Sequence, residues 1–313
     1  MIPTARADVI LCPGQGAQSP GMGRALAEAH PVAREVFARA DEILGVPLSQ
    51  TIWEGSAEAV DRTDVCQPGI YTVGVAALAV ARETGALDVG AARWAAGLSL
   101  GEYTALHVAG ALDFADGLRL VRRRGELMQE ASDAAPSGMA SVLGLDRDAL
   151  ERCCAEARDL GVIQVANLNA PGQIAISGAL GALERASELA KAAGARRVVR
   201  LAVAGAFHSE LMRPAADRLA EELANIEIRP PHIPVVSNVT ARPIDDPAEI
   251  RRALAAQVVS PVRWADSIAW LVAAGAASWA EIGPGRVLAG LMRRNAPDTT
   301  VLGFDEPADF EKE

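Results

Sequence analysis

The segment from 135 to 204 constrains the fold more than any other, because its short apolar runs and helical stretches alternate in a fixed order. The expected strands are 138–145, 162–168, 173–179 and 196–203, and the expected helices are 146–160 and 180–194. This order of strand, helix, two strands, helix and strand is typical of a ferredoxin-like unit. The sequence therefore predicts a ferredoxin-like subdomain at 135–204, inserted in a longer chain.

The segments on either side of this insertion predict a larger α/β unit. Apolar runs predict strands at 8–12, 92–97, 233–238 and 277–282, and helical patterns lie at 23–29, 32–44, 67–84, 102–109, 116–131, 209–225, 262–274 and 286–294. Half of the 313 residues are apolar, which is enough for a sizeable core. We expect 1–134 and 205–313 to form one large α/β domain, and the acidic tail at 305–313 to fray.

Charge and cysteine usage narrow the classes of function. The formal charge of −10 at pH 7 argues against a nucleic-acid partner, which would need a basic surface. The four cysteines form no C-x-x-C pair and have no histidine at zinc spacing, which predicts reduced thiols, no metal site and a cytoplasmic protein. The apolar run at 74–81 is too short to cross a bilayer, so no membrane contact is expected.

A serine stands between two glycines where a predicted strand meets a predicted helix, in Gly97-Leu98-Ser99-Leu100-Gly101. A nucleophile elbow needs a strand, a sharp turn and a helix, with small residues flanking a strained serine. The N–H groups at the start of the helix also favour an oxyanion nearby. Ser99 is therefore a candidate nucleophile, although a purely structural turn has the same pattern.

A nucleophilic serine needs a base, and the chain has four histidines. His107 lies along the helix that starts at the elbow, roughly 12 Å from the serine along the axis, which is beyond hydrogen-bond reach. His30 precedes a proline at a helix end, and His232 sits between prolines and an apolar strand. His208 follows the predicted strand 196–203, where catalytic residues gather, and is the favoured base.

One arginine lies on the wrong face of its helix. In 116–131, a projection at 100° per residue places Arg124 in the middle of the apolar stripe, opposite Arg123. A lone buried guanidinium costs several kcal/mol, so it must have a partner. Two alternatives stay open: an arginine that reaches solvent or an internal carboxylate, and a guanidinium fork that receives an anionic substrate group.

The glycine-rich loop at 13–18, PGQGAQ, is not a dinucleotide-binding fingerprint. Ser19 stands where G-x-G-x-x-G needs its last glycine, and no second strand with an acidic end follows. The loop instead places backbone N–H groups beside the sheet. One of them can complete an oxyanion hole with the N–H of Leu100.

Taken together, the motifs resemble a known family. They are PGQGAQ at 13–18, GLSLGEYTAL at 97–106, RRRGELMQ at 122–129, NLNAPGQIAISG at 167–178, GAFHSELM at 205–212, QVVSPVRW at 257–264 and EIGPGRVLAGL at 281–291. In this order they are similar to malonyl-CoA:acyl carrier protein transacylases, including the acyltransferase domains of polyketide synthases. The resemblance covers nearly the whole chain, and it implies an α/β-hydrolase-like large domain with a ferredoxin-like insert.

The resemblance also implies roles for individual residues. Ser99 matches the family's nucleophile, His208 its base and Arg124 its carboxylate-binding arginine. The amides of Gln15 and Leu100 match the oxyanion hole, and Gln257 matches the residue whose backbone carbonyl orients the histidine. Phe207 and Leu100 match malonyl-type members, in which a bulky ring crowds an added methyl group. One departure is Leu98, where many members have histidine, so any polar role at that position is lost.

The implied reaction is transfer of a malonyl group from malonyl-CoA to the phosphopantetheine thiol of an acyl carrier protein, through a malonyl-serine intermediate. It needs no metal or redox cofactor, and the expected protein is a monomer whose partners are malonyl-CoA and the carrier. A serine esterase or thioesterase of the α/β-hydrolase type is the alternative, and a non-catalytic binding module is a second one. The sequence leaves open whether the pathway makes fatty acids or polyketides.

Overall fold

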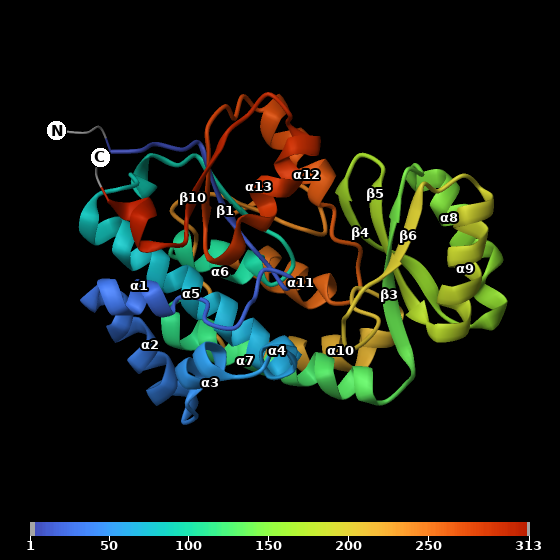
Figure 1. Ribbon diagram of the computed structural model, residues 1–313, viewed down its shortest axis with the longest axis horizontal. Coiled ribbons are helices and arrows are strands. Elements are labelled where there is room, and N and C mark those ends of the chain that lie inside the picture. Colours follow the sequence, from blue (N-terminus) through green and yellow to red (C-terminus); the bar gives the residue numbers. More distant parts are fainter. Residues whose placement is uncertain (1–3, 312–313) are drawn as a thin grey trace.

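The computed structural model describes residues 4–311 as two sheets flanked by helices (Figure 1). The six-stranded sheet has the order β10-β9-β1-β2-β7-β8. Its strands are β1 (Val9–Cys12), β2 (Trp94–Gly97), β7 (Val235–Val236), β8 (Pro243–Ile244), β9 (Trp279–Ile282) and β10 (Val301–Phe304). All neighbouring pairs are parallel except β7 and β8. The inner strands β1, β2 and β9 are buried along their whole length, as expected for a parallel sheet covered on both faces.

Strand side chains alternate between the two faces of this sheet, so both faces are apolar, and helices cover both of them. Ile10 and Cys12 belong to the core shared with α5 (Thr63–Thr84), whereas Val9 and Leu11 pack with α12 (Trp264–Ala273) and α13 (Val287–Asn295). The remaining helices of this unit are α1 (Arg24–Ala29), α2 (Pro31–Leu44), α3 (Leu48–Glu54), α4 (Ala57–Asp61), α6 (Gly101–Val108), α7 (Phe114–Asp133), α10 (Arg213–Ala224) and α11 (Pro247–Gln257).

Helix α5 is the central helix of the larger core. It starts four residues before the predicted 67–84, and by length and composition it could cross a membrane, with a mean hydropathy of 1.3 over its most apolar window. However, 83% of that window is buried inside the protein. The prediction of no apolar segment long enough to cross a bilayer rests on the run 74–81 alone. That prediction does not hold for the whole of α5. The burial is that of a core helix in this fold.

The segment 135–204 forms the four-stranded antiparallel sheet, with the order β4-β5-β3-β6. Its elements are β3 (Ser137–Leu143), α8 (Arg147–Glu156), β4 (Ile163–Ala170), β5 (Gln173–Ala179), α9 (Leu180–Ala192) and β6 (Arg197–Arg200), in the predicted order. The two helices cover the face turned away from the larger unit (Figure 1) and enclose a separate apolar core. Backbone hydrogen bonds of 2.8 Å from Leu168 to Val262, and from Val262 to Ala166, join the two units.

The chain end differs from the prediction of a frayed tail. A 3₁₀ helix spans Pro307–Phe310, and Phe310 is buried with its ring centroid 5.6 Å from that of Phe304. Asp309 and Glu306 cap this turn reciprocally. The prediction relies on the acidic composition and does not consider Phe310. The buried ring of Phe310 holds the segment in place as far as the described residues extend. Residues 312 and 313 lie outside them.

Candidate active site

A pocket of about 410 Å³ lies between the two units, beyond the C-terminal ends of β1 and β2. This is the edge of a parallel sheet where ligands bind in open α/β folds. Its polar lining residues are Gln15, Gln18, Ser99, Asn167, Asn169, Gln173 and His208. Its apolar lining residues include Leu98, Met128, Met139, Leu201, Val203, Phe207, Val287 and Leu291. Four of the predicted site residues, Gln15, Ser99, Phe207 and His208, thus share one pocket.

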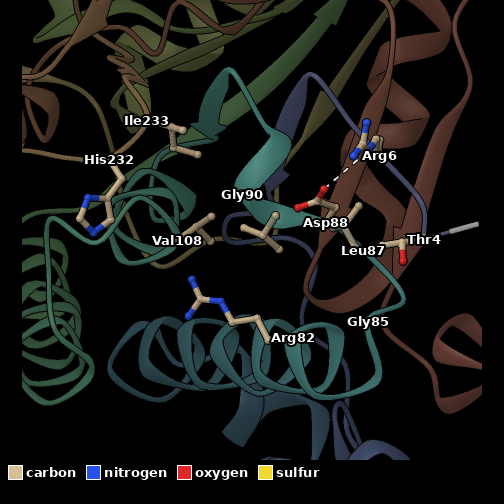
Figure 2. A pocket seen from close by; sticks show the side chains of 11 residues that line it. Thr4, Arg6, Arg82, Gly85, Leu87, Asp88, Gly90, Val108, His232 and Ile233 are labelled. Atoms are coloured by element: carbon tan, nitrogen blue, oxygen red, sulfur yellow. Dashed lines mark ion pairs between the residues drawn. The ribbon is translucent and has the colours of Figure 1, made fainter.

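A larger pocket of 790 Å³ lies at the opposite edge of the sheet, formed by segments that precede β1 and β2 (Figure 2). Figure 2 shows its one hydroxyl, on Thr4, and its one imidazole, on His232, at opposite sides. Arg6 is paired there with Asp88 at 3.5 Å. Among the described residues that line this pocket, no nucleophile lies beside a base, and His232 has no dyad partner there.

The Ser99 turn is built by its two glycines. A Cβ atom at Gly97 would lie 1.9 Å from the carbonyl of Gly101, and one at Gly101 would lie 2.0 Å from the carbonyl oxygen of Cys12. Only glycine allows β1, β2 and α6 to approach so closely. Ser99 itself has φ 54°, a left-handed conformation that is strained for serine. The strand, the sharp turn and the helix of the predicted elbow are all present.

Asn238 holds this turn in place from the loop after β7. Its Oδ1 accepts a hydrogen bond of 2.6 Å from the backbone N–H of Ser99, and its Nδ2 donates one of 2.7 Å to the carbonyl of Gly97. Both groups of the amide are therefore used on the two residues that flank Leu98. Asn238 is buried, so water does not compete for these bonds.

We expect Gly97→Ala to destabilise the protein by about 3 kcal/mol or more, because the added methyl group meets backbone atoms that cannot move aside. Thermal unfolding followed by circular dichroism measures the loss. Gly290→Ala is the matched control: it lies in α13 with open space around its Cβ position, and it should leave the melting temperature unchanged or raise it. Equal melting temperatures for the two variants would contradict this account of the elbow.

Ser99 and His208 form a hydrogen-bonded dyad. Ser99 Oγ lies 2.8 Å from His208 Nε2, and His208 Nδ1 donates to the backbone carbonyl of Gln257, also at 2.8 Å. Because a carbonyl only accepts, this bond places the proton on Nδ1 and leaves Nε2 free to accept the serine proton. Ser99 is 8% exposed and His208 4% exposed. Ser99 is thus within reach of a base, as the elbow pattern suggested.

Burial lowers the pKa of His208 to about 4, with a further lowering by the nearby Arg124 cation. The imidazole is therefore neutral at pH 7, which is the form that can accept a proton. His208 also has φ 58°, so both members of the dyad sit on strained backbone. Gln164 of β4 braces the His208 turn: its Nε2 donates to the carbonyls of His208 and Val259, each at 3.3 Å.

Arg124 is 1% exposed, and its guanidinium meets the dyad. Nη2 donates to Ser99 Oγ at 3.1 Å and to Gln257 Oε1 at 2.9 Å, and Nη1 donates to Gln67 Oε1 at 2.6 Å. Among residues 4–311, no carboxylate lies within ion-pair distance, and Nε is buried without a partner. Within the described residues, Arg124 therefore neither reaches solvent nor pairs with an internal carboxylate, and both of these structural alternatives are wrong.

The loop at 13–18 packs against the serine turn. A Cβ atom at Gly14 would lie 2.0 Å from the carbonyl oxygen of Leu98 and 3.6 Å from the amide nitrogen of Leu100. The amide of Gly16 donates to Gln18 Oε1, whereas the amides of Gln15 and Leu100 have no acceptor within the described part of the chain. Two free donors beside Ser99 are what an oxyanion hole requires.

Several residues around the site were not predicted from the sequence. They are Gln67, Glu102, Gln164 and Asn238, and each forms hydrogen bonds to a predicted residue or its backbone. Only Glu102 carried a signal, as a charged residue in the apolar start of α6. Residues 4–311 contain no cluster of three histidine, cysteine, aspartate or glutamate side chains that could hold a metal, and all four cysteines are buried and free.

Comparisons with known proteins show the family to which the chain belongs. The family model described as "Acyl transferase domain" matches residues 9–303. The chain is 44% identical to the malonyl CoA-acyl carrier protein transacylase of Bacillus subtilis, over 96% of this chain and 94% of the relative.

Two solved structures are also close. An acyl carrier protein S-malonyltransferase of Vibrio cholerae superposes with a TM-score of 0.92 at 40% identity, over 96% of this chain and 97% of that one. A malonyl-transacylase in complex with its type II polyketide synthase acyl-carrier protein has the same TM-score and coverage at 39% identity. The chain therefore belongs to the acyl transferase family, and within it to the malonyl-CoA:acyl carrier protein transacylases.

Proposed function

We propose that this enzyme transfers a malonyl group from malonyl-CoA to the phosphopantetheine thiol of an acyl carrier protein, through a malonyl ester of Ser99. The observation that carries this proposal is the meeting of Ser99, His208 and Arg124 in one cluster. Relatives named malonyl CoA-acyl carrier protein transacylase support the reaction, and the relative solved with a carrier protein supports the acceptor.

In the first step, His208 Nε2 takes the proton of Ser99 Oγ as the oxygen attacks the thioester carbonyl. The amides of Gln15 and Leu100 receive the negative oxygen of the tetrahedral intermediate. The intermediate collapses with loss of the CoA sulfur, which receives the proton from His208. In the second step the carrier thiol gives its proton to His208 and attacks the ester, and Ser99 regains its proton.

Arg124 selects an acyl group that ends in a carboxylate. Its unpartnered Nε supplies a donor in a buried site, and the fork matches a carboxylate in two hydrogen bonds. The bound carboxylate also offsets the positive charge that lowers the pKa of His208. Substrate binding thereby raises the basicity of His208 when the proton must be accepted. Phe207 lines the pocket that also contains Ser99 and His208, and it restricts space for a methyl branch.

The finer architecture and setting belong to the same proposal. The larger unit, 1–134 and 205–313, is α/β-hydrolase-like, and the unit at 135–204 is ferredoxin-like; both chain ends reach beyond the described residues. The strand order β4-β5-β3-β6 with two helices on one face supports the second assignment. The enzyme acts as a cytoplasmic monomer, without a metal or a redox cofactor.

A single experiment separates transfer from hydrolysis. The purified protein is incubated with malonyl-CoA, and its intact mass is measured before and after addition of a phosphopantetheinylated carrier. We expect one malonyl adduct per chain, stable for minutes in buffer and discharged to the carrier on mixing. Release of free malonate at the same rate with and without the carrier would instead assign the protein to the esterases or thioesterases.

A further inference from the structure

The carboxylate of Glu102 is buried next to the active site without lining the pocket. It is 1% exposed and lies in the first turn of α6, three residues after Ser99. Its Oε2 accepts a hydrogen bond of 2.6 Å from Gln257 Nε2 and one of 3.4 Å from the backbone N–H of Asn238. Burying a carboxylate is costly, and the reaction steps above do not use it.

The backbone carbonyl and both polar atoms of the Gln257 side chain contact the site. Its backbone carbonyl accepts from His208, and its Nε2 donates to Glu102 and, at 3.0 Å, to the carbonyl of Ser99. Its Oε1 accepts from Arg124. The amide is therefore held between a carboxylate at its nitrogen and a guanidinium at its oxygen. With both N–H groups in use, a rotation of the amide would turn Oε1 towards Glu102 and the NH₂ group towards Arg124, and both contacts would be repulsive.

We propose that Glu102 is a positioning residue for recognition of the malonyl carboxylate: it anchors the Gln257 amide, and that amide holds the guanidinium of Arg124. Glu102 is hydrogen-bonded to Gln257 and forms no ion pair with Arg124 within residues 4–311, so its negative charge compensates the buried cation without occupying the guanidinium donors. A carboxylate in direct contact with Arg124 would compete with malonyl. This inference rests on the proposed function and deepens it.

The arrangement makes recognition dependent on pH. Burial raises the pKa of Glu102 to about 7, so the anchoring charge is present above that pH and is lost as the pH falls below it. The charged and titratable groups around it are Arg124, Tyr103 and His208. Neither Tyr103 nor His208 changes charge between pH 6 and 8, because burial raises the pKa of Tyr103 to about 12 and lowers that of His208 to about 4.

The test compares kcat/KM for malonyl-CoA with that for acetyl-CoA, which lacks the carboxylate. At pH 8 we expect Glu102→Ala to lower the malonyl-to-acetyl ratio by about tenfold, the effect of losing one charge-assisted hydrogen bond. Glu102→Gln keeps an acceptor for Gln257 and imitates the protonated carboxyl, so its ratio should lie in between. As the pH falls to 6, the wild-type ratio should approach that of Glu102→Gln, whose own ratio stays flat.

Glu281→Gln is the matched control. Glu281 is equally buried, but its carboxylate accepts from the backbone N–H groups of Leu288 and Ala289. It should lower the melting temperature and leave the ratio unchanged. An unchanged ratio in both Glu102 variants, with both substrates losing activity equally, would overturn the inference. Wild-type malonyl-enzyme formation is measured first, since its absence would contradict the proposed function and not this role of Glu102.

Discussion

Ser99→Ala is expected to abolish the malonyl-enzyme and to lower transfer to the carrier by about 10⁴-fold or more, as the removal of a serine nucleophile does in other acyl transfers. The mutation removes Oγ, the atom that lies 2.8 Å from His208 Nε2. Alanine keeps the Cβ atom, so the strained φ of 54° and the hydrogen bond to Asn238 are retained. Intact mass spectrometry after incubation with malonyl-CoA reads out the adduct, and a thermal melt confirms the fold.

Ser187→Ala serves as the control for this experiment. Ser187 lies on α9 of the smaller unit, where its hydroxyl donates to the carbonyl of Leu183. That variant should acquire a malonyl group as the wild type does. A full malonyl adduct on Ser99→Ala would show that another residue is the nucleophile, and the assignment of the dyad would fail.

The order of elements in 135–204 was predictable because each element there has a clear period and a clear boundary. Most of the elements that escaped prediction are short. Helix α3 has seven residues and α4 five, too few for an apolar stripe to stand out, and β8 has two residues. Helix α11 was missed although its start is marked: Asp246 caps it and Pro247 is its first residue.

The residues of the site also divide into those that the sequence predicts and those that it does not. Arg124 was predictable because it is a charged residue within the apolar stripe of its helix. The elbow was predictable because two glycines flank its serine. Gln67, Gln164 and Asn238 have no such contrast with their neighbours. They are identified only by what they contact, on segments far apart in the sequence: Gln164 braces His208 from the other unit of the fold. Buried amides that complete a polar network are therefore determined by tertiary structure and not by local pattern.

Arg124→Ala is expected to lower kcat/KM for malonyl-CoA by a hundredfold or more while acetyl transfer is kept. Two charge-assisted hydrogen bonds to the malonyl carboxylate, each worth about 1.5–3 kcal/mol, are lost together. Acetyl-CoA makes neither bond. Removing the buried cation also removes a cause of the low pKa of His208, so its basicity should rise. Competition between malonyl-CoA and acetyl-CoA for the acyl-enzyme, read by intact mass, measures the preference directly.

Arg123→Ala tests whether this effect belongs to the buried guanidinium or to any arginine of α7. Arg123 points the other way, where it pairs with Glu126 at 3.2 Å and Glu222 at 3.0 Å. Its loss should leave the malonyl preference unchanged, because its guanidinium is paired with Glu126 and Glu222 and not with Ser99. Arg124→Lys should fall between Arg124→Ala and wild type, because it keeps a positive charge but not the fork that matches both carboxylate oxygens. A wild-type malonyl-to-acetyl ratio in Arg124→Ala would mean that the carboxylate is recognised elsewhere, and the buried arginine would then act only through Ser99 and Gln257.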